Sequence, residues 1–307
     1  MRRTISASSA TDTVVGVLIV CEYHTMRTTR QQVCEMSDDG RVPAVVERRD
    51  RVADLIGDQS LSARSVLATA LLGADQPHLT VGELVAMASL FGISDGAART
   101  CLWRMVANGE LTNDDGTYAL AGGLLERRQR VDEASRIAAT RPWGGTWELA
   151  VVSLERRSAA DRLALRKAAT ALHLAELREG VWIRPDNLDP DRLPTLRAVL
   201  DLQCVHFHDA ATNIPAATVR SLFSLDDWAA DARRLTLAMR DEIDAETVPA
   251  EDFAYQFGLS VTVVRHLQLD PLLPAELIPQ EWPGQDLRST YRRFNDVFKQ
   301  RLNTAFR

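Results

Sequence analysis

The sequence predicts an α+β protein of several domains, because three patterns of helices and strands follow one another along its 307 residues. Residues 61–120 read as three helices and a short hairpin, which is the order of a winged helix-turn-helix. Residues 147–208 alternate as strand, helix, strand, strand, helix, strand, the order of a ferredoxin-like domain. Only helical patterns recur after residue 224. We therefore expect a winged helix-turn-helix at 58–123, a ferredoxin-like domain at 143–223 and a helical C-terminal domain at 224–307.

The helices of the first domain begin at residues that are typical helix caps. Ser62 precedes the apolar positions of the first helix. Thr80 and Glu83 have the spacing of a capping box for the second helix. Phe91-Gly92-Ile93 makes the turn that follows, and Ser94 caps the third helix. These caps predict where all three helices start.

The third helix has one apolar face and one mixed face. An apolar stripe at helical spacing is expected to pack in the core. Its members are Ala98, Cys101, Leu102, Met105 and Val106. The opposite face carries Arg99, Thr100, Trp103, Arg104 and Ala107. After it, residues 111–120 read as two short strands around an Asp-Gly turn, which predicts the wing.

A helix in this position can enter the major groove of DNA. An arginine there can hold guanine O6 and N7 or bind a phosphate, which favours Arg99 and Arg104. Thr100 can contact a thymine methyl or a phosphate, and Ser94 can offer the helix N-terminus to a phosphate. A solvated face with ordinary surface arginines is the alternative. The candidate DNA-contacting residues are Arg64, Ser94, Arg99, Thr100, Trp103 and Arg104.

The charge of the chain excludes a protein that coats nucleic acid. The formal net charge is −6, and residues 61–125 hold three arginines against six acidic residues. Phosphate neutralisation supplies most non-specific DNA binding, so this local net charge of −3 predicts weak non-specific binding. Arg64 precedes the apolar side of the first helix and can reach a backbone phosphate, or remain a surface arginine.

The remaining segments complete the predicted domains. Residues 1–57 lack periodicity and are expected to form a disordered arm, with Val14–Cys21 too poor in signal features for a secretory leader. Residues 124–142 read as a charged linker helix. The central strands and helices are expected at 147–154, 159–172, 174–177, 181–184, 191–200 and 203–208, and the C-terminal helices at 225–243, 249–268 and 286–304. A proline-rich connector at 270–284 precedes the last helix.

The cysteines and the hydropathy pattern point to a cytoplasmic protein. The four cysteines, Cys21, Cys34, Cys101 and Cys204, lack the close paired spacing of a zinc site. No run approaches the roughly 20 apolar residues that cross a bilayer. We therefore expect a cytoplasmic protein with no membrane association, no cofactor and no metal.

His206-Phe-His208-Asp209 raises an enzymatic alternative. Alternate residues of a strand share a face, and histidine with aspartate can bind Zn or Mn. The hypothesis is then a metal-dependent nuclease or an acyl-CoA enzyme on the ferredoxin-like domain. The first strand ends in Ser153-Leu154-Glu155 and lacks the aspartate that nuclease chemistry would require there. No phosphate loop, nucleophile elbow or HExxH motif occurs either, so we expect no enzyme.

Four segments occur in a recognisable order along the chain. They are Phe91-Gly92-Ile93 through Gly109 in the helix-turn-helix, Trp143-Gly-Gly-Thr-Trp147, Gly180-Val-Trp182-Ile-Arg184-Pro185, and Asp270-Pro271 through Trp282-Pro283-Gly284. In this order they resemble the PaaX-type transcriptional repressors of phenylacetate catabolism, over residues 61–305. The resemblance implies a winged helix, a central Cas2-like ferredoxin fold and a helical C-terminal domain.

The resemblance also implies a function. Members of the family act as dimeric repressors released by an acyl-CoA, phenylacetyl-CoA in the type case. For this chain it implies a homodimeric regulator of a catabolic operon that binds double-stranded DNA at a pseudo-palindromic operator. Trp182 and Arg184 are candidate contacts of a CoA-like effector, because an indole stacks and a guanidinium pairs with phosphate. Core packing of the indole and a structural ion pair of the guanidinium are the alternative.

Two positions depart from the family pattern. The wing carries Asn113-Asp114-Asp115, where a DNA-reading wing more usually presents arginine or lysine. Trp103 stands where a small residue is expected on the exposed face. These departures leave open a third hypothesis, an interaction module whose winged helix no longer binds DNA.

Overall fold

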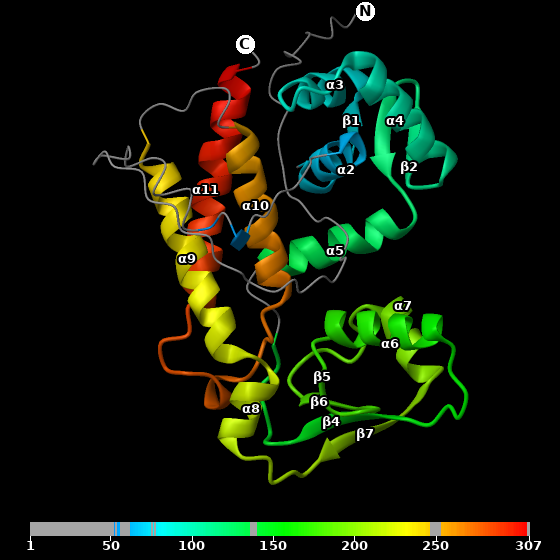
Figure 1. The fold of residues 1–307 in the computed structure, drawn as a ribbon, viewed down its shortest axis with the longest axis vertical. Coiled ribbons are helices and arrows are strands. Elements are labelled where there is room, and N and C mark those ends of the chain that lie inside the picture. The colour runs from blue at the N-terminus through cyan, green and yellow to red at the C-terminus, as the bar shows by residue number, and fades with distance from the viewer. Residues whose placement is uncertain are drawn as a thin grey trace, which may run out of the picture. The chain divides into compact units, whose positions relative to one another are not determined.

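The computed structural model describes residues 62–74, 76, 78–135, 140–245 and 253–305, together with residues 52, 54 and 55 (Figure 1). Nearly all of the predicted arm, residues 1–57, lies outside the described residues. By its internal contacts the chain forms two compact units. The first takes residues up to 128, 237–262 and 293–307, and the second takes 129–236 and 263–292. The predicted α+β architecture is confirmed.

The first unit contains the helices and strands in the predicted order. They are α2 (Ala63–Gly73), β1 (His78–Thr80), α3 (Val81–Ser89), α4 (Asp95–Ala107), β2 (Leu111–Asp114) and β3 (Thr117–Leu120). The strands form an antiparallel sheet in the order β1-β3-β2. Strand β1 was not predicted from the sequence, because three residues are too short to display a two-residue period. Only Leu79 of this strand is buried.

The predicted caps are confirmed. The Ser62 hydroxyl accepts a hydrogen bond from the Ser65 amide, and Ser94 accepts from Ala97. Thr80 and Glu83 form both hydrogen bonds of the capping box. Each cap satisfies amides that have no partner within the helix, which explains why these positions start α2, α3 and α4.

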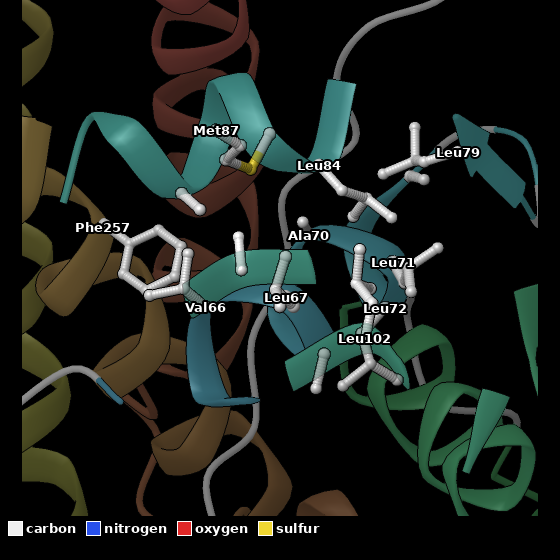
Figure 2. Close-up of a cluster of buried hydrophobic side chains, with 14 of the residues drawn as sticks. Val66, Leu67, Ala70, Leu71, Leu72, Leu79, Leu84, Met87, Leu102 and Phe257 are labelled. Carbon is white, nitrogen blue, oxygen red and sulfur yellow. The ribbon is translucent and has the colours of Figure 1, made fainter. Parts of the chain in front are cut away.

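The core of the first unit joins helices from both ends of the chain. Figure 2 shows Val66, Leu67 and Leu71 of α2 converging with Leu84 and Leu102. Phe257, from α10 (Phe253–Gln268), packs in the same cluster with its ring centroid 4.5 Å from that of Phe91. Phe298 and Leu302 of α11 (Gly284–Ala305) complete the cluster. The helices of the C-terminal segment therefore stabilise the N-terminal helices directly.

The second unit contains the predicted ferredoxin-like order. Its elements are β4 (Trp147–Val152), α6 (Ala159–Ala171), β5 (Ala175–Arg178), β6 (Val181–Pro185), α7 (Pro194–Asp201) and β7 (Cys204–Ala210). The antiparallel sheet has the order β5-β6-β4-β7, and α6 and α7 cover one face of it (Figure 1). Strands β5 and β7 are the sheet edges. The predicted linker helix is α5 (Gly123–Ser135).

The C-terminal segment is helical as predicted, with two additional short elements. α9 (Leu225–Ile243), α10 and α11 match the three expected helices. The unpredicted elements are α8 (Ala216–Leu222) and a 3-10 turn at Ala275–Leu277, both too short to give a clear helical period. No helix in the described part of the chain is long and apolar enough to span a membrane.

A buried ion pair joins the start of the proline-rich connector to α11. Arg288 donates to Asp270 at 2.7 Å, and both side chains are buried. A Cβ atom on Gly284 would lie 2.8 Å from the Trp282 indole nitrogen, so only glycine fits there. The Trp282 ring stacks on Trp228 at a centroid distance of 4.6 Å. This stacking joins the connector to α9.

Candidate nucleic-acid interface

Helix α4 is fixed in the core along one face. Ala98, Leu102 and Met105 are fully buried, and Cys101 and Val106 are half-buried against the same cluster. A helix anchored in this way holds its opposite face rigidly. That opposite face is exposed along its length, at Arg99, Thr100, Trp103, Arg104 and Ala107.

Of the two arginine side chains on this face, one is held by an ion pair and the other is not. Arg99 forms an ion pair with Asp95 one turn earlier, and this carboxylate raises the pKa of Arg99. Both side chains are more than half exposed, so the pair is a weak surface contact that water and a phosphate can replace. The Arg104 side chain forms no hydrogen bond or ion pair with the residues that the structure describes. Arg104 is therefore available without breaking a contact.

Thr100 and Trp103 give the centre of the face an apolar character. The Thr100 hydroxyl donates to the Gly96 carbonyl at 2.7 Å, within the helix. Trp103 is 71% exposed, although tryptophan is usually highly buried. These two side chains lie three positions apart and therefore on one side of the helix.

Arg64 is engaged away from this face. Its guanidinium Nε donates to both carboxylate oxygens of Glu110, at 3.2 and 2.9 Å. The pair is partly buried and links α2 to the segment before β2. The predicted phosphate contact of Arg64 would require this bidentate pair to open.

The hairpin β2–β3 has the predicted turn. Asp115 and Gly116 both take positive φ, 47° and 80°, which glycine and aspartate tolerate at a tight hairpin turn. The Gly116 amide donates to the Asn113 side chain at 3.1 Å. Asn113, Asp114 and Asp115 are exposed, so this tip presents negative charge to any approaching phosphate.

The two predicted effector contacts lie in the core of the second unit. Trp182 is 6% exposed, and Arg184 is 1% exposed. Arg184 donates to the carbonyls of Leu172, His173 and Pro185 and to the Asn187 side chain. Burial lowers the pKa of Arg184 to about 9. An effector that contacts either side chain must open this packing first, and the assignment stays a prediction.

The histidine cluster of β7 is divided between two faces of its strand. His206 and His208 stack with centroids 6.3 Å apart, beside a surface cavity lined by Pro190, Arg197 and Asp201. Asp209 instead takes a left-handed backbone and accepts a hydrogen bond from Thr146. Within the described residues, no group of three histidine, cysteine or acidic side chains gathers as metal ligands would.

The sequence analysis did not predict the ion pairs that restrain two of the candidate arginines. Asp95 pairs with Arg99, and Glu110 pairs with Arg64. Asp95 and Arg99 have the four-residue spacing of a helical ion pair, so this restraint could have been found from the sequence. Glu110 is 46 residues from Arg64 and carries no such signal.

Comparison with known proteins supports the family resemblance over most of the chain. Three family models match: PaaX-like protein at residues 62–124, PaaX protein central Cas2-like domain at 140–220, and PaaX-like protein C-terminal domain at 224–306. Among solved structures, the chain is similar to the uncharacterized protein Rv0674 from Mycobacterium tuberculosis, with 37% identity and a TM-score of 0.61. The match covers 80% of this chain and 99% of that one. No curated protein matches the chain.

Proposed function

The chain belongs to the PaaX-like family of transcription regulators, and from this premise we propose that it binds double-stranded DNA through the exposed face of α4. The observation that carries the proposal is the anchoring of α4 in the core, with Arg99, Thr100, Trp103 and Arg104 held outward on one side. This is the geometry that a recognition helix in a winged helix-turn-helix requires.

The regulator acts as a homodimer on a pseudo-palindromic operator. Two-fold symmetric proteins present the same helix twice, one helical turn of DNA apart. The second face of the central sheet supports the dimer, because Val205 and Phe207 of edge strand β7 are 50% and 51% exposed. They lie opposite Val151 and Leu149 of β4, so together they form an apolar surface that a second copy can cover.

The regulator is a cytoplasmic repressor of a catabolic operon and responds to an acyl-CoA. The family resemblance supports this part of the proposal. Release of DNA requires that the effector bind the DNA-incompetent conformation more tightly than the competent one. An effector that displaces the packing around Trp182 and Arg184 would meet this condition, since both are buried in the described conformation.

The test is selection of bound fragments from a genomic DNA pool by the purified full-length protein, at about 0.15 M salt, where exposed charges are largely screened. We expect an enriched palindromic motif. Arg104→Ala should weaken binding to it by about tenfold or more, since a bidentate base contact contributes about 1–3 kcal/mol. Arg178→Ala is the matched control, because Arg178 is exposed at the end of β5 in the second unit.

Failure to enrich any motif, with the protein folded and dimeric, would overturn the proposal. The second candidate function would then be favoured, a protein-interaction module. Two observations favour that candidate: the exposed Trp103 and the acidic tip at Asp114 and Asp115.

A further inference from the structure

The exposed face of α4 has an apolar centre that the family pattern does not explain. Trp103 is 71% exposed and is the most exposed aromatic side chain among the described residues. Thr100 lies one turn before it and Ala107 one turn after it, so the three share one strip of the helix.

The polar group of Thr100 is directed into the helix itself. Its hydroxyl donates to the Gly96 carbonyl at 2.7 Å, so an outside group can meet its methyl group or its acceptor oxygen but finds no free hydroxyl donor. Together with the Trp103 indole and the Ala107 methyl, the strip offers an incoming surface almost no hydrogen-bonding capacity. The exceptions are the indole N–H donor and the remaining acceptor lone pairs of the Thr100 oxygen.

The charged groups of the face lie beside this strip. The Arg104 side chain has no partner among the described residues, and the Arg99 side chain is held by Asp95. Positively charged side chains therefore flank an apolar centre. This arrangement suits DNA, in which phosphates border a groove that can contain an apolar group.

In a major groove the only apolar group on a base edge is the thymine C5-methyl. The guanine, adenine and cytosine edges present hydrogen-bond donors and acceptors, which an indole face and two methyl groups cannot satisfy. We propose that Trp103, supported by Thr100, reads thymine methyl groups at the centre of each operator half-site. This inference rests on the proposed function, since it assumes that α4 enters a major groove.

The expected effect can be stated for one methyl. Burial of one such group contributes about 0.8 kcal/mol, which corresponds to about fourfold in affinity. Loss of the contacted methyl in both half-sites should therefore weaken binding by about fifteenfold.

The experiment uses the duplex recovered by genomic selection and the full-length protein. Synthetic copies carry deoxyuridine in place of thymine at one position at a time, which removes only the methyl group. We expect about fourfold weaker binding at one thymine of each half-site. Trp103→Ala should bind the parent and deoxyuridine duplexes equally at that position. Deoxyuridine placed outside the selected motif is the control for the duplex. An unchanged melting temperature of the Trp103→Ala protein is the control for folding.

Each result has a distinct meaning. If the protein binds a selected motif and no deoxyuridine substitution changes its affinity, the thymine inference is overturned and the proposed DNA binding is retained. A Trp103→Ala variant that stays sensitive to deoxyuridine also overturns it, because the reading group is then another residue. Failure to select any motif overturns the proposed function, and this inference with it.

Discussion

Replacement of Asp95 by asparagine should strengthen DNA binding and make it more dependent on salt. Asp95 forms the ion pair that holds Arg99 on the exposed face of α4. Asparagine keeps the size of the side chain in the first turn but removes the charge. Arg99 is then free to contact a phosphate, and the negative charge that opposes the contact is gone.

The magnitude follows from one new phosphate contact in each copy of the proposed dimer. Each contact changes the slope of log affinity against log salt by about −0.9, so two copies change it by about −1.8. The gain in affinity of Asp95→Asn over the parent should therefore shrink by about twelvefold between 0.05 and 0.2 M salt. Fluorescence anisotropy on the selected operator, repeated at five salt concentrations, measures this slope.

The control is Asp296→Asn, which makes the same charge change at an exposed position of α11. It should leave the slope of the parent unchanged. Parallel salt plots for Asp95→Asn and the parent would refute the reasoning, since Arg99 would then make no additional phosphate contact. A slope change of equal size in Asp296→Asn would attribute the effect to net charge alone.

Three further predictions concern the fold and the assembly. Phe257→Ala should destabilise the first unit by about 3–5 kcal/mol, since its ring is fully buried against Phe91; urea denaturation measures this, and a cost below 1 kcal/mol would contradict the packing. Burial, with Arg192 nearby, lowers the pKa of His173 well below 6.5, so the unfolded chain binds the proton first as the pH falls. The protonation of this group should lower the free energy of unfolding by about 1.4 kcal/mol for each pH unit below 6.5. Asparagine tolerates the positive φ of this position, so His173→Asn is the test variant. Its urea midpoint should fall less steeply with decreasing pH than that of the parent. Phe207→Asp should convert the proposed dimer to a monomer in analytical ultracentrifugation, and a dimer that forms unchanged in this variant would exclude the exposed face of β7 as the contact.

The helix starts and the core stripe of α4 could be predicted from the sequence because they depend on neighbouring residues. Ser62, Thr80 and Ser94 cap amides within three residues of themselves, so their spacing alone identifies them. Exposure of Trp103 follows from the same helical period. The order of strands in the central sheet could also be predicted, because a β-α-β-β-α-β pattern has few ways to pair.

The contacts that restrain the candidate residues could not be predicted, because they join distant parts of the chain. Phe257 packs against Phe91, which is 166 residues earlier in the sequence. Glu110 accepts a hydrogen bond from Arg64, which is 46 residues earlier. The direction of the Thr100 hydroxyl is also invisible in the sequence, since threonine can turn either group outward. Such choices depend on tertiary packing and rotamers.

The negative charge around α4 is expected to lower the affinity for DNA without lowering selectivity. The acidic tip at Asp114 and Asp115 and the Asp95–Arg99 pair both weaken attraction to phosphate, which is the same for every DNA sequence. The proposed contacts of Trp103 and Arg104 with base edges do not depend on this attraction. A regulator competes with about 10⁶ or more non-specific sites in a genome, so the ratio of specific to non-specific affinity matters more than either value. It follows that Asp95→Asn should tighten binding to the operator and to random duplexes by similar factors, and so leave the ratio of the two affinities unchanged.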